Sequence, residues 1–176
     1  MKASNVNHIK KLTVASLLAA LTCAATLLVI TYSPAGGYIH LGDCFVLLSG
    51  FLMGPLWGGV AAGLGSALTD LMLGYASYIP ATFLVKWGTA AVAAVLMRLM
   101  TRKSARFSIA KRALSAAAGE CVMVCGYFAY ECVIYGFAGA FPNVLLNLIQ
   151  GASGVVAATL LIIPITKIKY LRNFWI

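Results

Sequence analysis

The chain has 176 residues, of which 62% are hydrophobic and 10% are charged, whereas about 25% of the residues of an ordinary globular domain are charged. This composition, with a mean hydropathy of +0.95, excludes a typical water-soluble domain and indicates an integral membrane protein. We expect its basic residues, which give a net charge of +9, to meet a lipid bilayer and not nucleic acid. At about 20 residues per spanning helix, roughly six helices fit into a single all-α membrane domain, 1–176.

The apolar segments predict these six transmembrane helices in order. The first, 12–32, follows three lysines, as in a secretory signal peptide, but the run is long for one and many apolar segments follow. A lipid-attachment site at Cys23 is a second alternative, which the residues before it match poorly. The second helix is expected to stop at Gly54 and Pro55, because proline cannot continue the helical hydrogen bonds. The remaining predicted helices cover 41–53, 56–73, 81–100, 113–135 and 143–166.

The positive charges predict the orientation of these helices. Twelve of the thirteen Lys and Arg residues lie at the N-terminus, around the loop after the fourth helix, or in the C-terminal tail. The loops at 33–40, 74–80 and 136–142 contain none. Because basic residues favour the cytoplasmic side, we expect both termini in the cytoplasm and these three loops outside.

Lys86 and all four acidic residues fall within predicted spans. Ionisable groups are costly there and often mark a functional site. Four of the five are expected near the outer surface, at the ends of different helices: Asp43, Asp70, Lys86 and Glu131. Glu120 lies eleven residues before Glu131, which places it roughly 16 Å nearer the cytoplasm, so we expect it to lie apart from this layer.

Other polar residues belong to the same outer layer. Asn147 and Gln150 begin the sixth helix with a spacing that puts them on one face. His40 lies in the first outer loop, and Tyr38 and Tyr78 flank the polar loops. The co-location of these groups predicts a small-molecule site.

Each of these groups also has a purely structural interpretation. Lys86 with Asp43 or Asp70 forms a plausible structural ion pair. The amides of Asn147 and Gln150 are typical of hydrogen bonds between membrane helices. Most of the tyrosines fit the aromatic belt of a membrane interface.

The sequence predicts neither a metal site nor an enzyme. Cys121 and Cys125 share a helix face, but no CxxC pair occurs, and His8 and His40 are expected on opposite sides of the membrane. No phosphate-binding loop is present, so ATP hydrolysis would need partner subunits. We expect no cofactor.

Several short motifs resemble a known family. They are the outer segment GGYIHLGD at 36–43, GPLWGG at 54–59, GSALTD at 65–70, and PAT at 80–82 followed by Lys86. Together they resemble the substrate-binding S components of energy-coupling factor (ECF) vitamin transporters, and in particular the hydroxymethylpyrimidine and pyridoxine branch. The resemblance covers nearly all six helices, with its specific part in residues 36–86.

The resemblance implies a multi-pass protein of the bacterial plasma membrane that captures a vitamin from outside. It would deliver the vitamin through a membrane coupling subunit driven by two cytoplasmic ATPases. In such proteins an AxxxA motif on the first helix contacts the coupling subunit. Ala15 and Ala19 fit that motif, and Ala20 and Ala24 repeat it. Small residues four apart also serve ordinary helix packing.

The resemblance and the side chains together favour pyridoxine or hydroxymethylpyrimidine as the cargo. A stand-alone proton-coupled secondary transporter is the alternative, since such proteins also use intramembrane acids, but no convincing inverted repeat is visible. A membrane enzyme would need a nucleophile and base in one layer, and a structural subunit would bind no ligand.

Overall fold

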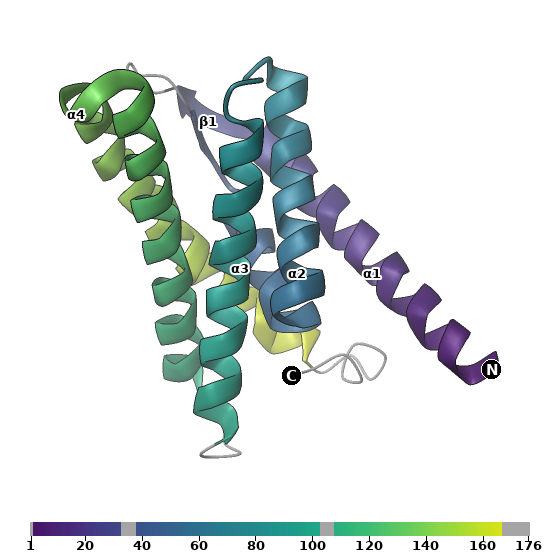
Figure 1. Cartoon of the computed structure of the whole chain (residues 1–176). Helices are drawn as coiled ribbons and strands as arrows, with labels where there is room; N and C mark the ends of the chain where they lie inside the picture. The colour runs from purple at the N-terminus through teal and green to yellow at the C-terminus, as the bar shows by residue number, and fades with distance from the viewer. Residues whose placement is uncertain (1, 33–37, 103–107, 167–176) are drawn as a thin grey trace.

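This computed structural model describes residues 2–32, 38–102 and 108–166, which form long helices and one short β-hairpin (Figure 1). In order they are α1 (Lys2–Leu27), β1 (Val29–Tyr32), β2 (Tyr38–His40), α2 (Asp43–Leu73), α3 (Ile79–Arg102) and α4 (Ile109–Ile165). Each of the four helices is long and apolar enough to cross a membrane. The fold is therefore helical, as predicted, with the hairpin as an addition.

The first helix ends earlier than predicted. It was expected to cover 12–32, but α1 ends at Leu27 and the next residues form β1. The β-branched and aromatic side chains of Val29–Tyr32 favour extended backbone. The strand pairs antiparallel with β2, with Val29 opposite His40 and Tyr32 opposite Tyr38. The hairpin thereby brings Tyr38 and His40 against α1 and α4.

Helix α2 is broken at Gly54, where the sequence predicts the end of the second helix. Gly54 has φ 80° and ψ −176°, a conformation open mainly to glycine, and Pro55 then suits the first turn of the next helical segment. The two segments pack closely: a Cβ atom on Gly58 would lie 2.2 Å from the carbonyl oxygen of Ser49. The chain therefore folds back on itself within α2.

Helix α4 folds back in the same way, but its turn is tighter than predicted (Figure 1). A loop was expected over 136–142, whereas only Gly136 departs from helical geometry, with φ 73° and ψ 168°. Phe137 already belongs to the second segment, and Pro142 lies inside it. The expected boundaries 113–135 and 143–166 are thus too narrow. For the fourth predicted helix, 81–100, α3 extends slightly beyond both ends.

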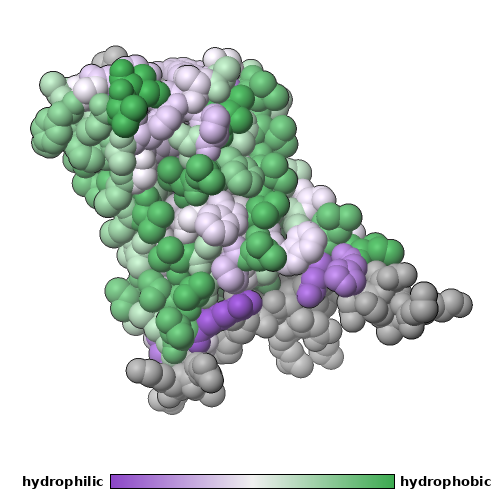
Figure 2. All heavy atoms as spheres, viewed as in Figure 1, coloured by the Kyte–Doolittle hydropathy of each residue, from purple (hydrophilic) through white to green (hydrophobic). Residues whose placement is uncertain are grey.

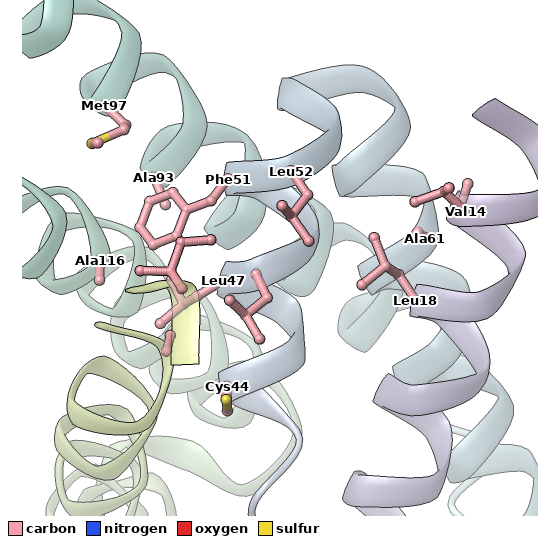
Figure 3. Packing of buried hydrophobic residues seen from close by; sticks show 14 residues of the cluster. Val14, Leu18, Cys44, Leu47, Phe51, Leu52, Ala61, Ala93, Met97 and Ala116 are labelled. Carbon is pink, nitrogen blue, oxygen red and sulfur yellow. The ribbon is translucent and has the colours of Figure 1, made fainter. Parts of the chain in front are cut away.

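The apolar core lies between α2 and its neighbours (Figure 3). Leu47 and Phe51 of α2 face Ala93 and Met97 of α3, all of them buried. On the other side of α2, Ala61 packs toward Val14 and Leu18 of α1. Helix α2 is therefore the centre of the bundle.

The β-hairpin, the turn between α2 and α3 and the bend of α4 gather at one end of the bundle, called here the hairpin end (Figure 1). The surface between the two ends is largely hydrophobic, and the most hydrophilic side chains visible on this face lie at the opposite end (Figure 2). Two residues of the GGYIHLGD segment, Gly36 and Gly37, lie outside the described residues. So do five of the basic residues that predict the orientation: Lys103, Arg106, Lys167, Lys169 and Arg172.

Candidate functional site

A cavity of about 40 Å³ lies at the hairpin end. Every described residue that lines it carries a polar atom in its side chain, although 62% of the residues of the chain are hydrophobic. The lining comes from α1, β2, α2, the following turn, α3 and α4: Thr26, Tyr38, His40, Ser66, Asp70, Tyr75, Tyr78, Thr82, Tyr127, Glu131, Asn147 and Gln150. A polar cavity in an apolar bundle is suited to a ligand that lipid would not hold.

One side of the cavity is built around Asp70, near the C-terminal end of α2. Its side chain is 4% exposed, and the Tyr38 hydroxyl donates a hydrogen bond to Asp70 Oδ1 over 2.7 Å. Among the described residues, Asp70 Oδ2 has no direct hydrogen bond, although Thr82 lies beside the carboxylate. Burial, followed by the Asp70 charge, raises the pKa of Tyr38 well above its ordinary value, so this tyrosine stays a donor.

Glu131 of α4 supplies a second carboxylate. It is buried, and the Tyr78 hydroxyl donates to its Oε1 at 3.5 Å, the long limit for such a bond. Glu131 Oε2 has no direct hydrogen bond within the described part of the chain, and Asn143 lies beside the carboxyl group. The cavity therefore has an acceptor oxygen available on each of two carboxylates.

Tyrosine rings connect the two carboxylates. Ring centroids are 5.3 Å apart for Tyr38 and Tyr75, and 6.1 Å for Tyr75 and Tyr78. Tyr130 extends the run, with its ring 5.3 Å from that of Tyr78. Tilted and edge-on contacts at these distances are the favourable arrangements of aromatic pairs. Three elements, β2, the turn after α2 and α4, thus meet through this tyrosine run.

A second polar cluster lies next to the cavity and is centred on an ion pair. Lys86 is fully buried and forms a salt bridge with Asp43, and the side-chain amide of Gln150 donates to Asp43 Oδ2 over 2.7 Å. The Lys86 ammonium also lies 5.3 Å from the centre of the Tyr127 ring, within range of a cation–π interaction. Neither Asp43 nor Lys86 lines the cavity. Their mutual pairing agrees with the structural interpretation.

His40 joins this cluster to the cavity wall. Its backbone N–H donates to Gln150 Oε1 over 3.1 Å, and its Nδ1 accepts from the N–H of Gly42 over 3.0 Å. Burial lowers the pKa of His40 to about 4, although the nearby Asp43 carboxylate acts in the opposite direction. The imidazole is therefore neutral at physiological pH, with Nδ1 free of a proton to accept the Gly42 bond.

Glu120 was expected to lie apart from the outer polar layer; it does not line the cavity, but it lies close to Asp43. Both acids contact Gly154 of the second segment of α4. If Gly154 carried a Cβ atom, that atom would lie 2.9 Å from Asp43 Cβ and 3.4 Å from Glu120 Oε1. Because α4 folds back, its second segment carries Gly154 between them. Glu120 is 4% exposed, and neither carboxylate oxygen has a hydrogen-bond partner among the described residues.

Of the twelve described residues that line the cavity, seven were predicted from the sequence and five were not. Seven of the predicted site residues line the cavity: Tyr38, His40, Asp70, Tyr78, Glu131, Asn147 and Gln150. The missed residues are three hydroxyl side chains, Thr26, Ser66 and Thr82, and two tyrosines, Tyr75 and Tyr127. The tyrosines fitted an aromatic belt equally well, and Ser66 was hidden among small packing residues. In the described part of the chain, no group of three or more His, Cys, Asp or Glu side chains could hold a metal ion.

The predicted docking residues face the interior. Ala15 is buried and Ala19 is half-buried, and both pack with the core cluster around α2. Among the α1 residues whose side chains are described, Ser16, Ala20 and Ala24 are small and exposed, and they follow one another at intervals of four. Ala20 and Ala24, which repeat the predicted motif, therefore lie on the exposed face of α1, whereas Ala15 and Ala19 do not.

Comparison with known proteins gives the family. A model of the ECF-type riboflavin transporter S component matches residues 6–167. The chain belongs to this family of S components. The predicted resemblance is thus confirmed, and the protein is a membrane-bound, substrate-binding component of a vitamin or vitamin-precursor transporter, not an enzyme.

Two relatives extend this result. An uncharacterised protein of Pyrococcus woesei is 34% identical over 137 residues, which cover 78% of this S component and 88% of the relative. The thiamine precursor transporter HmpT of Lactococcus lactis subsp. cremoris is 27% identical over 176 residues, covering 99% of this chain and 98% of HmpT. The similarity to HmpT is consistent with the hydroxymethylpyrimidine branch named by the sequence motifs.

Proposed function

We propose that this S component captures a small polar heteroaromatic vitamin or precursor from outside the cell, with hydroxymethylpyrimidine as the first candidate and pyridoxine as the second. The observation that carries the proposal is the cavity at the hairpin end, in which tyrosine rings and two carboxylates surround one small space. The rings can stack on a flat heterocycle, and the carboxylates accept hydrogen bonds from its hydroxyl or amino groups.

The size of the cavity supports a single-ring cargo. A volume of about 40 Å³ is room for only a few water molecules, so even one ring requires side chains of the tyrosine run to move. A three-ring compound such as riboflavin would require far more rearrangement. The similarity to the thiamine precursor transporter HmpT, which extends over 99% of the chain, supports the pyrimidine.

The protein would work with a membrane coupling subunit and two cytoplasmic ATPases, as its family implies. The breaks at Gly54 and Gly136 divide α2 and α4 in two and support a topology of six spanning segments in the plasma membrane. The clustering of Lys and Arg supports cytoplasmic termini, with the hairpin end outside. On α1, the exposed residues Ser16, Ala20 and Ala24 are a better candidate for subunit contact than Ala15 and Ala19.

A thermal-shift panel on the purified protein tests this function. The panel contains hydroxymethylpyrimidine, pyridoxine, pyridoxal, thiamin, riboflavin and pantothenate. A ligand at about 100 times its dissociation constant adds roughly 2.7 kcal/mol to the free energy of unfolding, which raises the melting temperature measurably. We expect hydroxymethylpyrimidine to give the largest shift. A cooperative melt that none of these compounds moves would contradict the proposal.

The second candidate is stand-alone, proton-coupled uptake, which is favoured by one observation. Glu120 is a buried intramembrane acid without a hydrogen-bond partner among the described residues, as in many proton pathways. Uptake of radiolabelled hydroxymethylpyrimidine into proteoliposomes distinguishes the two candidates. We expect no uptake by this chain alone under a proton gradient, whereas uptake that a protonophore abolishes would establish the second candidate.

A further inference from the structure

The charges around the cavity limit what it can bind. The described residues of its lining include two carboxyl groups, those of Asp70 and Glu131, but no Lys or Arg side chain. Lys86 lies beside the lining residue Tyr127, but it is fully buried and paired with Asp43. His40, which also lines the cavity, accepts a hydrogen bond at Nδ1 and is neutral. An anionic group on a ligand would therefore meet two carboxyl groups and no basic side chain among the described lining residues.

The unpaired carboxylate oxygens of the cavity define which hydrogen-bond donors a ligand needs. Asp70 Oδ2 and Glu131 Oε2 belong to side chains that are 4% and 3% exposed, and neither atom has a direct hydrogen bond among the described residues. Their other oxygens are held by Tyr38 and Tyr78, which stand at the two ends of the run through Tyr75. Leaving a buried acceptor unpaired is unfavourable, so the bound state needs a donor at each end of the tyrosine run.

We propose that Asp70 and Glu131 are the specificity-determining residues of this S component, and that they select a neutral or protonated heteroaromatic ring with hydrogen-bond donors at two separate positions while rejecting its phosphorylated or carboxylated forms. This inference rests on the proposed function, because it assumes that the cavity is the ligand site. It adds that the transporter discriminates between a free vitamin precursor and its phosphate ester.

Matched ligand pairs test the rejection of anions. Isothermal titration of the unmodified protein compares hydroxymethylpyrimidine with its monophosphate, and pyridoxine with pyridoxine 5′-phosphate. For the ring that binds, we expect its phosphate ester to bind at least a hundredfold more weakly. A phosphate ester that binds within tenfold of the free compound would overturn the inference and leave the proposed function standing. Absence of binding by all four compounds would contradict both.

Isosteric variants test the two acceptors. Asp70→Asn and Glu131→Gln each replace an acceptor oxygen with a donor NH₂ group, so each is expected to weaken binding of the free ring about tenfold to a hundredfold. Glu120→Gln is the matched control, because Glu120 is an equally buried acid that does not line the cavity. It should bind the ring within about twofold of the unmodified protein.

The variants also separate a direct contact from a general effect of charge. Asp70→Asn and Glu131→Gln are first checked for a cooperative melt near that of the unmodified protein. If the folded variants bind as tightly as Glu120→Gln does, the role assigned to the two carboxylates is wrong. If a variant does not fold, the matched ligand pairs on the unmodified protein still decide the inference.

Discussion

Helices α2 and α4 are built on the same plan but have different places in the bundle. Each is predominantly apolar and folds back at one glycine with positive φ. Of the most apolar 18-residue segment of each helix, 67% is buried in α2 but only 33% in α4. Mean hydropathy does not distinguish them, since it is 1.7 for α2 and 2.0 for α4. In a membrane, apolarity determines insertion, whereas the small residues that let helices approach determine which helix becomes the centre.

The largest expected effect comes from the ion pair that ties α2 to α3. Lys86→Met leaves the buried Asp43 carboxylate without its cation, and breaking such a pair typically costs about 3 to 5 kcal/mol. The matched change in α4 is Glu120→Gln, which removes no hydrogen bond made by the described residues and should change stability by less than about 1 kcal/mol. Reversible unfolding in mixed micelles measures both. Equal losses would show that α4 is anchored as firmly as α2.

The next largest loss of stability is expected where the two segments of α2 pack backbone against backbone, at Gly58 and Ser49. Gly58→Ala places a Cβ atom 2.2 Å from the Ser49 carbonyl oxygen, which is backbone and cannot rotate away. We expect a loss of about 3 kcal/mol, at the upper end of overpacking effects. Gly88→Ala is the control, because its Cβ would make an ordinary contact of 3.4 Å with Val122. Thermal unfolding that ranks Gly88→Ala as the more damaging change would contradict this account of α2.

The same substitution, phenylalanine to alanine, can be compared in the two helices. Phe51 of α2 is 2% exposed, whereas Phe141 of α4 is 63% exposed. Because lipid is as apolar as the core, Phe51→Ala loses packing and not hydrophobic transfer energy, and the cavity left behind should cost about 2 kcal/mol. Phe141→Ala should cost less than about 0.5 kcal/mol. If Phe141→Ala is as destabilising in detergent, α4 is more constrained than its exposure indicates.

The effect that is smallest at neutral pH, where it vanishes, is a pH dependence at the contact between β2 and α4. The pKa of His40 is about 4 in the folded protein, below its ordinary value of about 6.5. The unfolded chain therefore binds more protons in this range, and stability should fall by about 1.4 kcal/mol per unit as pH drops from 6.5 toward 4. Above pH 6.5 the group adds no dependence. His40→Asn should flatten this slope, measured as the melting temperature against pH, and an unchanged slope would exclude His40 as its source.

The sequence predicted helical breaks where local chemistry decides them. At Gly54 and Pro55, loss of a backbone donor and a glycine-only conformation coincide, and the structure has its break there. Near Gly136 the same reasoning extended the loop to Pro142, because proline was given more weight than the glycine before it. The strand Val29–Tyr32 was missed because a short apolar run resembles helix and strand alike, and only its pairing with β2 decides between them.

The candidate site was predictable where a side chain is unusual in its setting. Asp70 and Glu131 stand out as acids in apolar spans, and both line the cavity. Tyr127 and Ser66 do not stand out, because each suits ordinary membrane packing. The position of Glu120 depends on α4 folding back to bring Gly154 between it and Asp43, a relation across 34 residues that no local pattern contains.

The pairing of Lys86 with Asp43 also bears on how the chain enters the membrane during synthesis. A lysine in a spanning helix adds to the free energy of insertion, by about 2.5 to 3.5 kcal/mol at the helix centre and by less toward the ends. Asp43 precedes Lys86 by 43 residues, so the ribosome releases the carboxylate first. When α3 leaves the insertion machinery, its ammonium group can meet a counterion already in the bilayer. A chain that loses Asp43 leaves this lysine without its counterion, so α3 should insert less efficiently.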